Sequence, residues 1–139
     1  MKSKPDISNL LVQICKQRRN KSNALLADVG VHGGQDILLY YLSMKDGQTI
    51  SELAEKMCIK FATISNMVNR MEVREIIRRE KDGIDLRVTR LYLTGKGKSA
   101  YKLISEIWKQ MESLLVKNLS LQEQEILKSL LTKILKNLE

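Results

Sequence analysis

The sequence predicts an α+β fold class, mainly α-helical with one small β-hairpin. In several segments apolar residues recur every three or four positions, which is the period of an amphipathic helix. Two strand-like runs, IIRRE and RVTRLYL, interrupt this pattern and are joined by a short loop that contains Gly83. The single proline is at position 5, so the rest of the chain is free to be helical. A chain of 139 residues is long enough for one domain, and we expect a single domain over residues 1–139.

The N-terminal segment is expected to form the first helix, because Ile7, Leu10, Leu11 and Ile14 fall on one helical face. Glycines at positions 30, 33 and 34 then mark a turn. The run GQDILLYYLSMKDG after that turn has the composition of a second, largely apolar helix. The chain's one histidine, His32, lies in the turn and is interpreted as a surface or helix-start residue.

The segment TISELAEKMCIKFATISNMVNRMEVREII predicts two short helices that meet at a tight turn. Thr49 and Glu52 have the spacing of a capping box at the start of the first helix. Ala54 provides the small residue that a close helix crossing requires, and Cys58 in the turn is expected to pack in the core. The remaining apolar positions fit a shared core, and they are Ile50, Leu53, Met57, Ile59, Ile64, Met67, Val68 and Met71.

The second helix of this pair keeps a polar face on its start and outer side. Its side chains are of the types that hydrogen-bond base edges and phosphates. We therefore predict DNA contacts at Lys60, Thr63, Ser65, Asn66, Asn69 and Arg70. An amphipathic helix pair in an unrelated all-α domain would also have a polar face of this kind.

The following hairpin favours the DNA-binding interpretation, because it is rich in basic residues. Arg79 and Lys81, on or beside the first strand, are predicted DNA contacts together with Asp85 and Arg87 on the return side. Gly83 is expected to take a positive φ at the tip. Asp85 is placed to pair with Arg87 and orient its guanidinium toward a minor groove. An ordinary exposed hairpin is the alternative. Together with the helix pair, the hairpin predicts a winged helix–turn–helix over about residues 33–93.

The flanking helices, about residues 5–27 and 95–138, predict a dimer. Ser120 and Glu123 have capping-box spacing at the start of the last helix. The apolar stripes are wider than one winged module would cover, so a second subunit is expected to bury them. Near the C-terminus these stripes contain Leu103, Ile104, Ile107, Trp108, Met111, Leu114, Leu115, Leu127, Leu131, Ile134 and Leu138.

In the order of these elements the chain resembles the MarR family of transcriptional regulators over nearly its whole length. The most specific matches are Asp85-Leu86-Arg87, then Leu93-Thr94 and Gly97. The resemblance implies a homodimer whose terminal helices interlock and whose two winged modules bind a pseudo-palindromic double-stranded DNA operator. One departure is Glu75, where the family usually has a glycine that closes the recognition helix in a left-handed conformation. We expect this helix either to run on or to end under slight strain.

Composition limits the possible functions. The net charge of +8 and a pI near 9.6 favour a polyanionic partner. Only 4% of residues are aromatic, which argues against a stacking platform for single-stranded nucleic acid.

The sequence contains no catalytic motif and no cluster of histidine and cysteine, so we expect no enzyme activity, cofactor or metal. With no apolar run long enough to span a membrane and no signal-peptide core, a cytoplasmic protein without membrane association is expected.

Two interpretations of signal sensing remain open. Cys15 precedes a basic run that includes Lys16, Arg18 and Arg19, and nearby cations lower a thiol's pKa. Oxidant-sensing members of the resembled family carry a lone reactive cysteine in this helix, close to tyrosines of the partner subunit, which makes Cys15 a candidate redox switch. The commoner arrangement in the family is a small aromatic or phenolic effector, which we expect near Tyr40, Tyr41, Met44 and Trp108.

The sequence therefore predicts a dimeric, sequence-specific DNA-binding regulator, most simply a repressor released by a small-molecule effector. Two alternatives belong to other classes. One is a winged-helix protein-interaction module that does not bind DNA, and the other is a winged dimerisation domain detached from an enzyme such as a methyltransferase. The polar recognition face disfavours the first, and a chain that closes with a capped helix disfavours the second.

Overall fold

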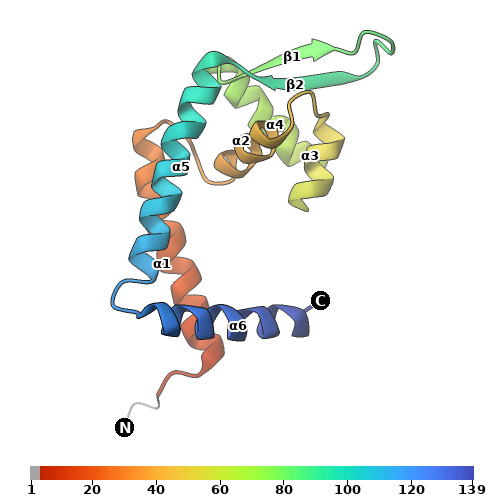
Figure 1. The fold of residues 1–139 in the computed structure, drawn as a ribbon. Coiled ribbons are helices and arrows are strands. Elements are labelled where there is room, and N and C mark those ends of the chain that lie inside the picture. Colours follow the sequence, from red (N-terminus) through yellow and green to blue (C-terminus); the bar gives the residue numbers. More distant parts are fainter. Residues whose placement is uncertain (1–3) are drawn as a thin grey trace. The chain divides into compact units, whose positions relative to one another are not determined.

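The computed structural model describes residues 4–139 and is mainly helical, with one two-stranded antiparallel sheet (Figure 1). This confirms the predicted fold class. Within the described range the elements follow in the order α1 (Ile7–Asp28), α2 (Gln35–Met44), α3 (Ile50–Met57), α4 (Phe61–Val73), β1 (Ile77–Lys81), β2 (Thr89–Leu93), α5 (Gly95–Leu115) and α6 (Leu121–Asn137). None of the helices in residues 4–139 is long and apolar enough to cross a membrane.

The chain divides into two compact units, one ending at Ile107 and the other formed by Trp108–Glu139, so that the boundary falls inside α5. The larger unit contains α1 to α4, the β-hairpin and the first part of α5. Figure 1 shows its hairpin beside α2, α3 and α4, and each of these helices contacts one of the two strands. The helix pair and the basic hairpin thus belong to the same unit.

The core of the larger unit is formed by apolar residues from every one of these elements. On α4, Ile64, Val68 and Met71 are fully buried at the spacing predicted for its inner face. Leu53 of α3 is equally buried, while Met57, Ile59 and Met67 are half-buried at the edge. Further fully buried side chains come from α1, the turn after it, α2, the hairpin and α5, and they are Leu26, Val31, Leu38, Leu39, Leu42, Ile77, Leu91 and Ile104.

Both predicted capping boxes are present. Glu52 N–H donates to Thr49 Oγ1 at 3.1 Å, and Thr49 N–H donates back to the Glu52 carboxylate at 3.1 Å. In the smaller unit Ser120 and Glu123 make the same reciprocal pair at 3.1 and 3.2 Å. Each box satisfies amides that the first helical turn leaves without a partner, which fixes where α3 and α6 begin.

The turns that close α3 and α4 each contain a left-handed residue that is not glycine. Cys58 has φ 53°, and the bonds from Ile59 N–H to Ala54 O and from Cys58 N–H to Glu55 O complete a Schellman motif. The expectation that Cys58 packs in the core is wrong, since its side chain is exposed. The motif turns Ile59 toward the helix and leaves the αL residue on the outside.

Glu75 plays the same part after α4. It has φ 61°, with Ile76 N–H bonded to Met71 O and Glu75 N–H to Glu72 O, both at 2.9 Å. The helix therefore ends where glycine is usual, and it ends under strain rather than running on. Ile76 and Met71, the residues that such a motif brings into apolar contact, are both buried.

The hairpin register pairs Ile77 with Leu93 at one end and Lys81 with Thr89 at the other. Arg87 and its neighbour Val88 consequently lie in the loop rather than on the second strand. The expected positive φ at Gly83 is wrong. Within residues 4–139 the glycines with a positive φ are Gly30, Gly34 and Gly47. The carboxylate of Asp82 makes the turn instead, accepting hydrogen bonds from the amides of Ile84 and Asp85.

Thr94 and Gly97 form a close junction between the hairpin and α5. Thr94 N–H donates to Ile76 O at 3.1 Å, its hydroxyl donates to Glu75 O at 2.5 Å, and Gly97 N–H donates to that hydroxyl at 3.0 Å. A Cβ at Gly97 would lie 2.1 Å from the Ile76 carbonyl oxygen, so only glycine fits there. This contact explains why the pattern Leu93-Thr94 is followed by Gly97.

Apolar side chains remain exposed on the terminal helices. On α1 the exposed residues are Ile7, Leu10, Val12 and Ile14. In the smaller unit α6 exposes Leu121, Ile126, Leu127, Leu130, Leu131, Leu135 and Leu138. This is far more apolar surface than isolated surface residues account for.

Candidate nucleic-acid interface

The polar face predicted on the second helix of the pair lies on α4, opposite its buried stripe. Thr63, Asn66, Asn69 and Arg70 are exposed and Ser65 is half-buried. Lys60 is exposed at the N-cap position, and its side chain makes no capping hydrogen bond. The first amides of α4 therefore have no side-chain cap, and a lysine lies beside them.

A groove of about 500 Å³ runs between the start of α3, the first turns of α4 and the hairpin. It brings together three residues predicted separately to bind DNA, Ser65, Arg79 and Arg87. Its other lining residues are Thr49, Ile50, Ser51, Phe61, Val88 and Thr89. None of these six residues was among the predicted DNA contacts.

The geometry ties two of the predicted DNA contacts to each other. Arg79 of β1 donates through Nε to the Glu72 carboxylate at 3.1 Å and through Nη2 to Asn69 Oδ1. Because its carbonyl oxygen accepts this bond, Asn69 has its amide N–H groups left for other partners. Arg79 thus braces the hairpin against α4 in addition to contributing positive charge.

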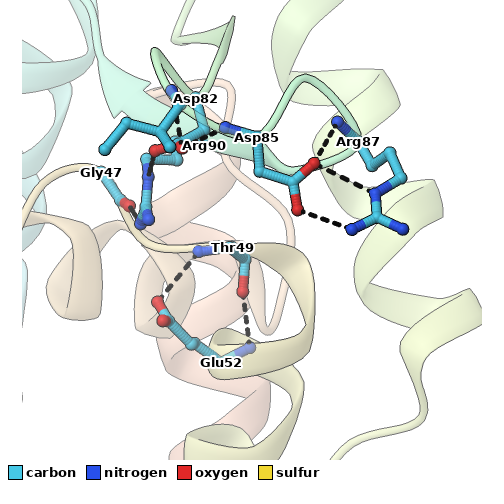
Figure 2. Close-up of polar contacts among 8 residues, drawn as sticks. Gly47, Thr49, Glu52, Asp82, Asp85, Arg87 and Arg90 are labelled. Atoms are coloured by element: carbon cyan, nitrogen blue, oxygen red, sulfur yellow. Dashed lines mark hydrogen bonds and ion pairs between the residues drawn. The ribbon is translucent and has the colours of Figure 1, made fainter.

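Asp82 organises the hairpin loop (Figure 2). Its carboxylate accepts Ile84 N–H at 3.1 Å, Asp85 N–H at 2.9 Å and Arg90 Nε at 2.9 Å. These hydrogen bonds, the one from the Asp85 amide first, lower the pKa of Asp82 to about 2. Arg90 also donates to Gly47 O at 2.8 Å, which connects the loop to the segment between α2 and α3.

Asp85 and Arg87 form the predicted pair, with two parallel hydrogen bonds of 3.1 Å from Nε and Nη2 to the two carboxylate oxygens. Asp85 also accepts Arg87 N–H at 3.0 Å, and the side-chain and backbone bonds together lower the pKa of Asp85. The Arg87 side chain is 90% exposed, so the pair adds little to stability. Its effect is to hold the guanidinium in one orientation against the Asp85 carboxylate (Figure 2).

Two other basic residues of the hairpin differ in their surroundings. Lys81 is exposed at the end of β1, where it pairs in register with Thr89. Arg78 forms an ion pair with Glu80 at 2.8 Å and lies over the Tyr92 ring, 4.5 Å from its centroid. Arg78 is therefore held on the face of the sheet that carries Tyr92, whereas Lys81 extends the positive charge toward the loop.

The candidate effector residues do not all fall in one unit. Tyr40 and Tyr41 of α2 have ring centroids 5.3 Å apart, and the Tyr41 hydroxyl donates to Lys56 O at 3.5 Å. Met44, at the end of α2, is 70% exposed, and Trp108 belongs to the smaller unit. Across the described residues no group of three or more His, Cys, Asp and Glu side chains is arranged to hold a metal ion.

Cys15 is exposed on α1. It borders a cleft of about 690 Å³ between α1 and α2. The lining of that cleft contains two arginines and none of the candidate effector residues, and it consists of Cys15, Arg18, Arg19, Ser22, Asn23, Leu26, Gly33, Gly34, Asp36 and Ile37.

A helix pair with a capped first helix and a polar outer face on the second, joined to a basic hairpin, defines a winged helix–turn–helix protein. The model of the MarR family matches residues 37–89. An uncharacterized HTH-type transcriptional regulator of Bacillus subtilis, YsmB, is 30% identical over 112 residues, which are 77% of this chain and 75% of that protein. The chain belongs to the MarR family of transcription regulators, and family membership makes it a regulator rather than an enzyme.

Solved structures agree with this assignment. The MepR–DNA complex of Staphylococcus aureus has a TM-score of 0.85 and 29% identity, covering 96% of this chain and 99% of the other. A crystal structure of MarR has a TM-score of 0.81 with 22% identity, covering 99% and 93% of the two chains, and so shows likeness of fold alone.

Proposed function

We propose that this protein is a sequence-specific regulator that binds double-stranded DNA as a homodimer. The observation that carries the proposal is the shared groove, where the polar face of α4 and Arg87 of the hairpin loop approach one another. A recognition helix in the major groove beside a basic wing is the geometry that such modules use on DNA. Support comes from the net charge of +8 and from MepR, which has been solved in complex with DNA.

The surroundings of each side chain suggest its role. Thr63, Ser65 and Asn66 lie in the first two turns of α4 and are proposed to contact base edges. Lys60, Arg70 and Lys81 are proposed to contact phosphates, since they are exposed cations around that face. Arg87 is proposed to enter the minor groove with Asp85 orienting it, and the Arg79–Asn69 pair to connect the two contact surfaces.

The exposed apolar residues of α1 and α6 support a dimer in which a second copy buries them. Two winged modules related by a two-fold axis would bind a pseudo-palindrome with half-sites about one helical turn apart. Sedimentation should give a dimer at micromolar concentration, and Leu131→Glu on α6 should yield monomer or unfolded chain. A folded wild-type monomer under those conditions would contradict the dimer.

We further propose that the protein acts as a repressor in the cytoplasm, where it meets chromosomal DNA. Release by a small aromatic or phenolic effector is proposed to involve Tyr40, Tyr41, Met44 and Trp108. Aromatic rings with a polar tip, such as the paired tyrosines of α2, suit a ligand of that chemistry.

Fluorescence anisotropy on a duplex selected by the protein from a random library tests DNA binding. Arg87→Ala should weaken binding by roughly 1–3 kcal/mol, and Asp85→Ala should weaken it less because Asp85 only orients the arginine. Arg78→Ala is a matched control, since Arg78 is held over Tyr92. If no duplex is selected, or if Arg87→Ala binds like wild type, the proposed interface is wrong.

A further inference from the structure

The first turn of α4 exposes three carbon-rich side chains in succession. Phe61 is the first residue of the helix and is 55% exposed, and Ala62 and Thr63 after it are exposed as well. Ile59 before the helix is half-buried and Ile64 within it is fully buried, so residues other than Phe61 supply the core at this end of the helix. The core therefore gives no reason for a phenylalanine at position 61, which is the only one in the chain.

Phe61 lies in the groove that carries the proposed DNA contacts. It lines the same space as Ser65, one turn further along α4, and Arg87 of the hairpin loop. The N-terminal residues of a recognition helix are the ones that meet base edges in the major groove. Two arginines and four hydroxyl side chains line the groove beside the ring, which suits a polyanion such as DNA better than an apolar protein partner.

Chemistry then determines which base this turn can recognise. Guanine is recognised by arginine or lysine and adenine by asparagine or glutamine, and residues 61–63 contain none of these. Phenylalanine, alanine and the methyl of threonine are instead the groups that make apolar contact with the 5-methyl of thymine. We infer that the first turn of α4 selects thymine in the operator half-site through its 5-methyl group, with Phe61 as the principal contact.

This inference rests on the proposed function and adds the chemistry by which one part of the operator is chosen. Replacing a single thymine by deoxyuridine removes only the methyl group and keeps every hydrogen-bonding group in both grooves. At the contacted position the wild-type protein should bind the uracil duplex about fourfold more weakly, which is the effect of leaving one methyl unburied.

The test scans thymine-to-uracil replacements through a duplex that wild-type protein has selected from a random library. Phe61→Ala should lose most of the preference for the thymine duplex over the uracil duplex, with little change in thermal unfolding because the ring is more than half exposed. Val73→Ala is the matched control, since Val73 is 84% exposed at the other end of the same helix and should keep the full thymine preference.

The outcomes separate this inference from the proposed function. Failure of wild-type protein to select any duplex contradicts DNA binding itself. Selection of a duplex in which no thymine methyl affects affinity overturns the inference alone. A thymine preference that Phe61→Ala retains in full also overturns it, because the methyl would then be contacted by another residue.

Discussion

Arg90 Nε lies 2.9 Å from Asp82 Oδ1, and through this pair the loop of the hairpin is fastened to the rest of the winged module. The same guanidinium reaches Gly47 O at 2.8 Å, while the other oxygen of Asp82 accepts the amides of Ile84 and Asp85. Asp85 in turn orients Arg87. Arg90 therefore positions the proposed minor-groove contact without lying beside it.

Arg90→Met should weaken operator binding while leaving its salt dependence unchanged. The substitution releases the loop from Gly47 and from one of the bonds to Asp82, so ordering the loop on DNA costs additional conformational entropy. Because the Arg90 guanidinium is paired with Asp82 and Gly47 O, it makes no phosphate contact and so releases no counterion from DNA. Anisotropy titrations at several salt concentrations would measure affinity and slope together.

Lys81→Met is the matched control, since Lys81 is an exposed cation on the neighbouring strand. Its loss should reduce the slope of log affinity against log salt by about 1, as expected for one phosphate contact. An equal reduction of the slope in Arg90→Met would mean that Arg90 contacts phosphate and would contradict its positioning role.

Asp82 should make the free energy of unfolding depend on pH. Its pKa is lowered from the ordinary 3.8 to about 2, so the folded state favours the ionised carboxylate. The stabilisation is fully present above pH 4 and is lost as the pH falls toward 2. Thermal unfolding of wild type and Asp82→Asn should therefore differ at neutral pH and converge between pH 4 and pH 2. A difference that is constant over this range would contradict the assignment.

Short-range features of the site could be predicted from the sequence. The capping pair Thr49 and Glu52 is three residues apart, and the pair Asp85 and Arg87 is two apart. At such separations local backbone geometry alone brings the partners together, so residue type and spacing suffice. The buried stripe of α4 was predictable for the same reason, because helical periodicity determines it.

Contacts between distant segments could not be predicted in this way. Arg90 meets Gly47 only after β2 has packed beside the segment that precedes α3, and Arg79 meets Glu72 only after the hairpin has turned back along α4. The abundance of basic residues in the hairpin favoured DNA binding as a whole, but it did not separate cations that face DNA from cations paired within the protein. The fold assigns several of those charges to internal partners, and only the tertiary structure distinguishes the two uses.

Cys58 and Gly83 show how local rules mislead when another local motif prevails. Apolar neighbours made Cys58 a core candidate, but the Schellman motif at the end of α3 turns it outward. Glycine at a hairpin tip suggested a positive φ, but the Asp82 carboxylate closes the turn without one. Phe61 could not be predicted as a site residue, because apolar character alone does not distinguish a core position from an exposed one.

Gly97→Ala should destabilise the protein by about 1–3 kcal/mol, the usual cost of overpacking. The added Cβ would lie 2.1 Å from the Ile76 carbonyl oxygen, and backbone must move to make room. Gly95→Ala is the control two residues away, where an added Cβ meets nothing within 4 Å. It should be neutral or stabilise by up to about 1 kcal/mol. Chemical denaturation would compare the two, and equal midpoints would contradict the close junction.

Glu75→Gly should stabilise the protein, although it removes a side chain and gains no contact. Glu75 has φ 61°, and a left-handed residue with a Cβ costs about 1–2 kcal/mol. Glycine's greater freedom in the unfolded chain offsets part of that gain, leaving about 0.5–1 kcal/mol in favour of the variant. The backbone bonds that close α4 are retained, so DNA affinity should not change.

Glu55→Gly, inside α3, should instead destabilise by about 0.5–1 kcal/mol, because there glycine only weakens a helix. Urea unfolding that showed both glutamate substitutions destabilising would mean that the end of α4 carries no strain.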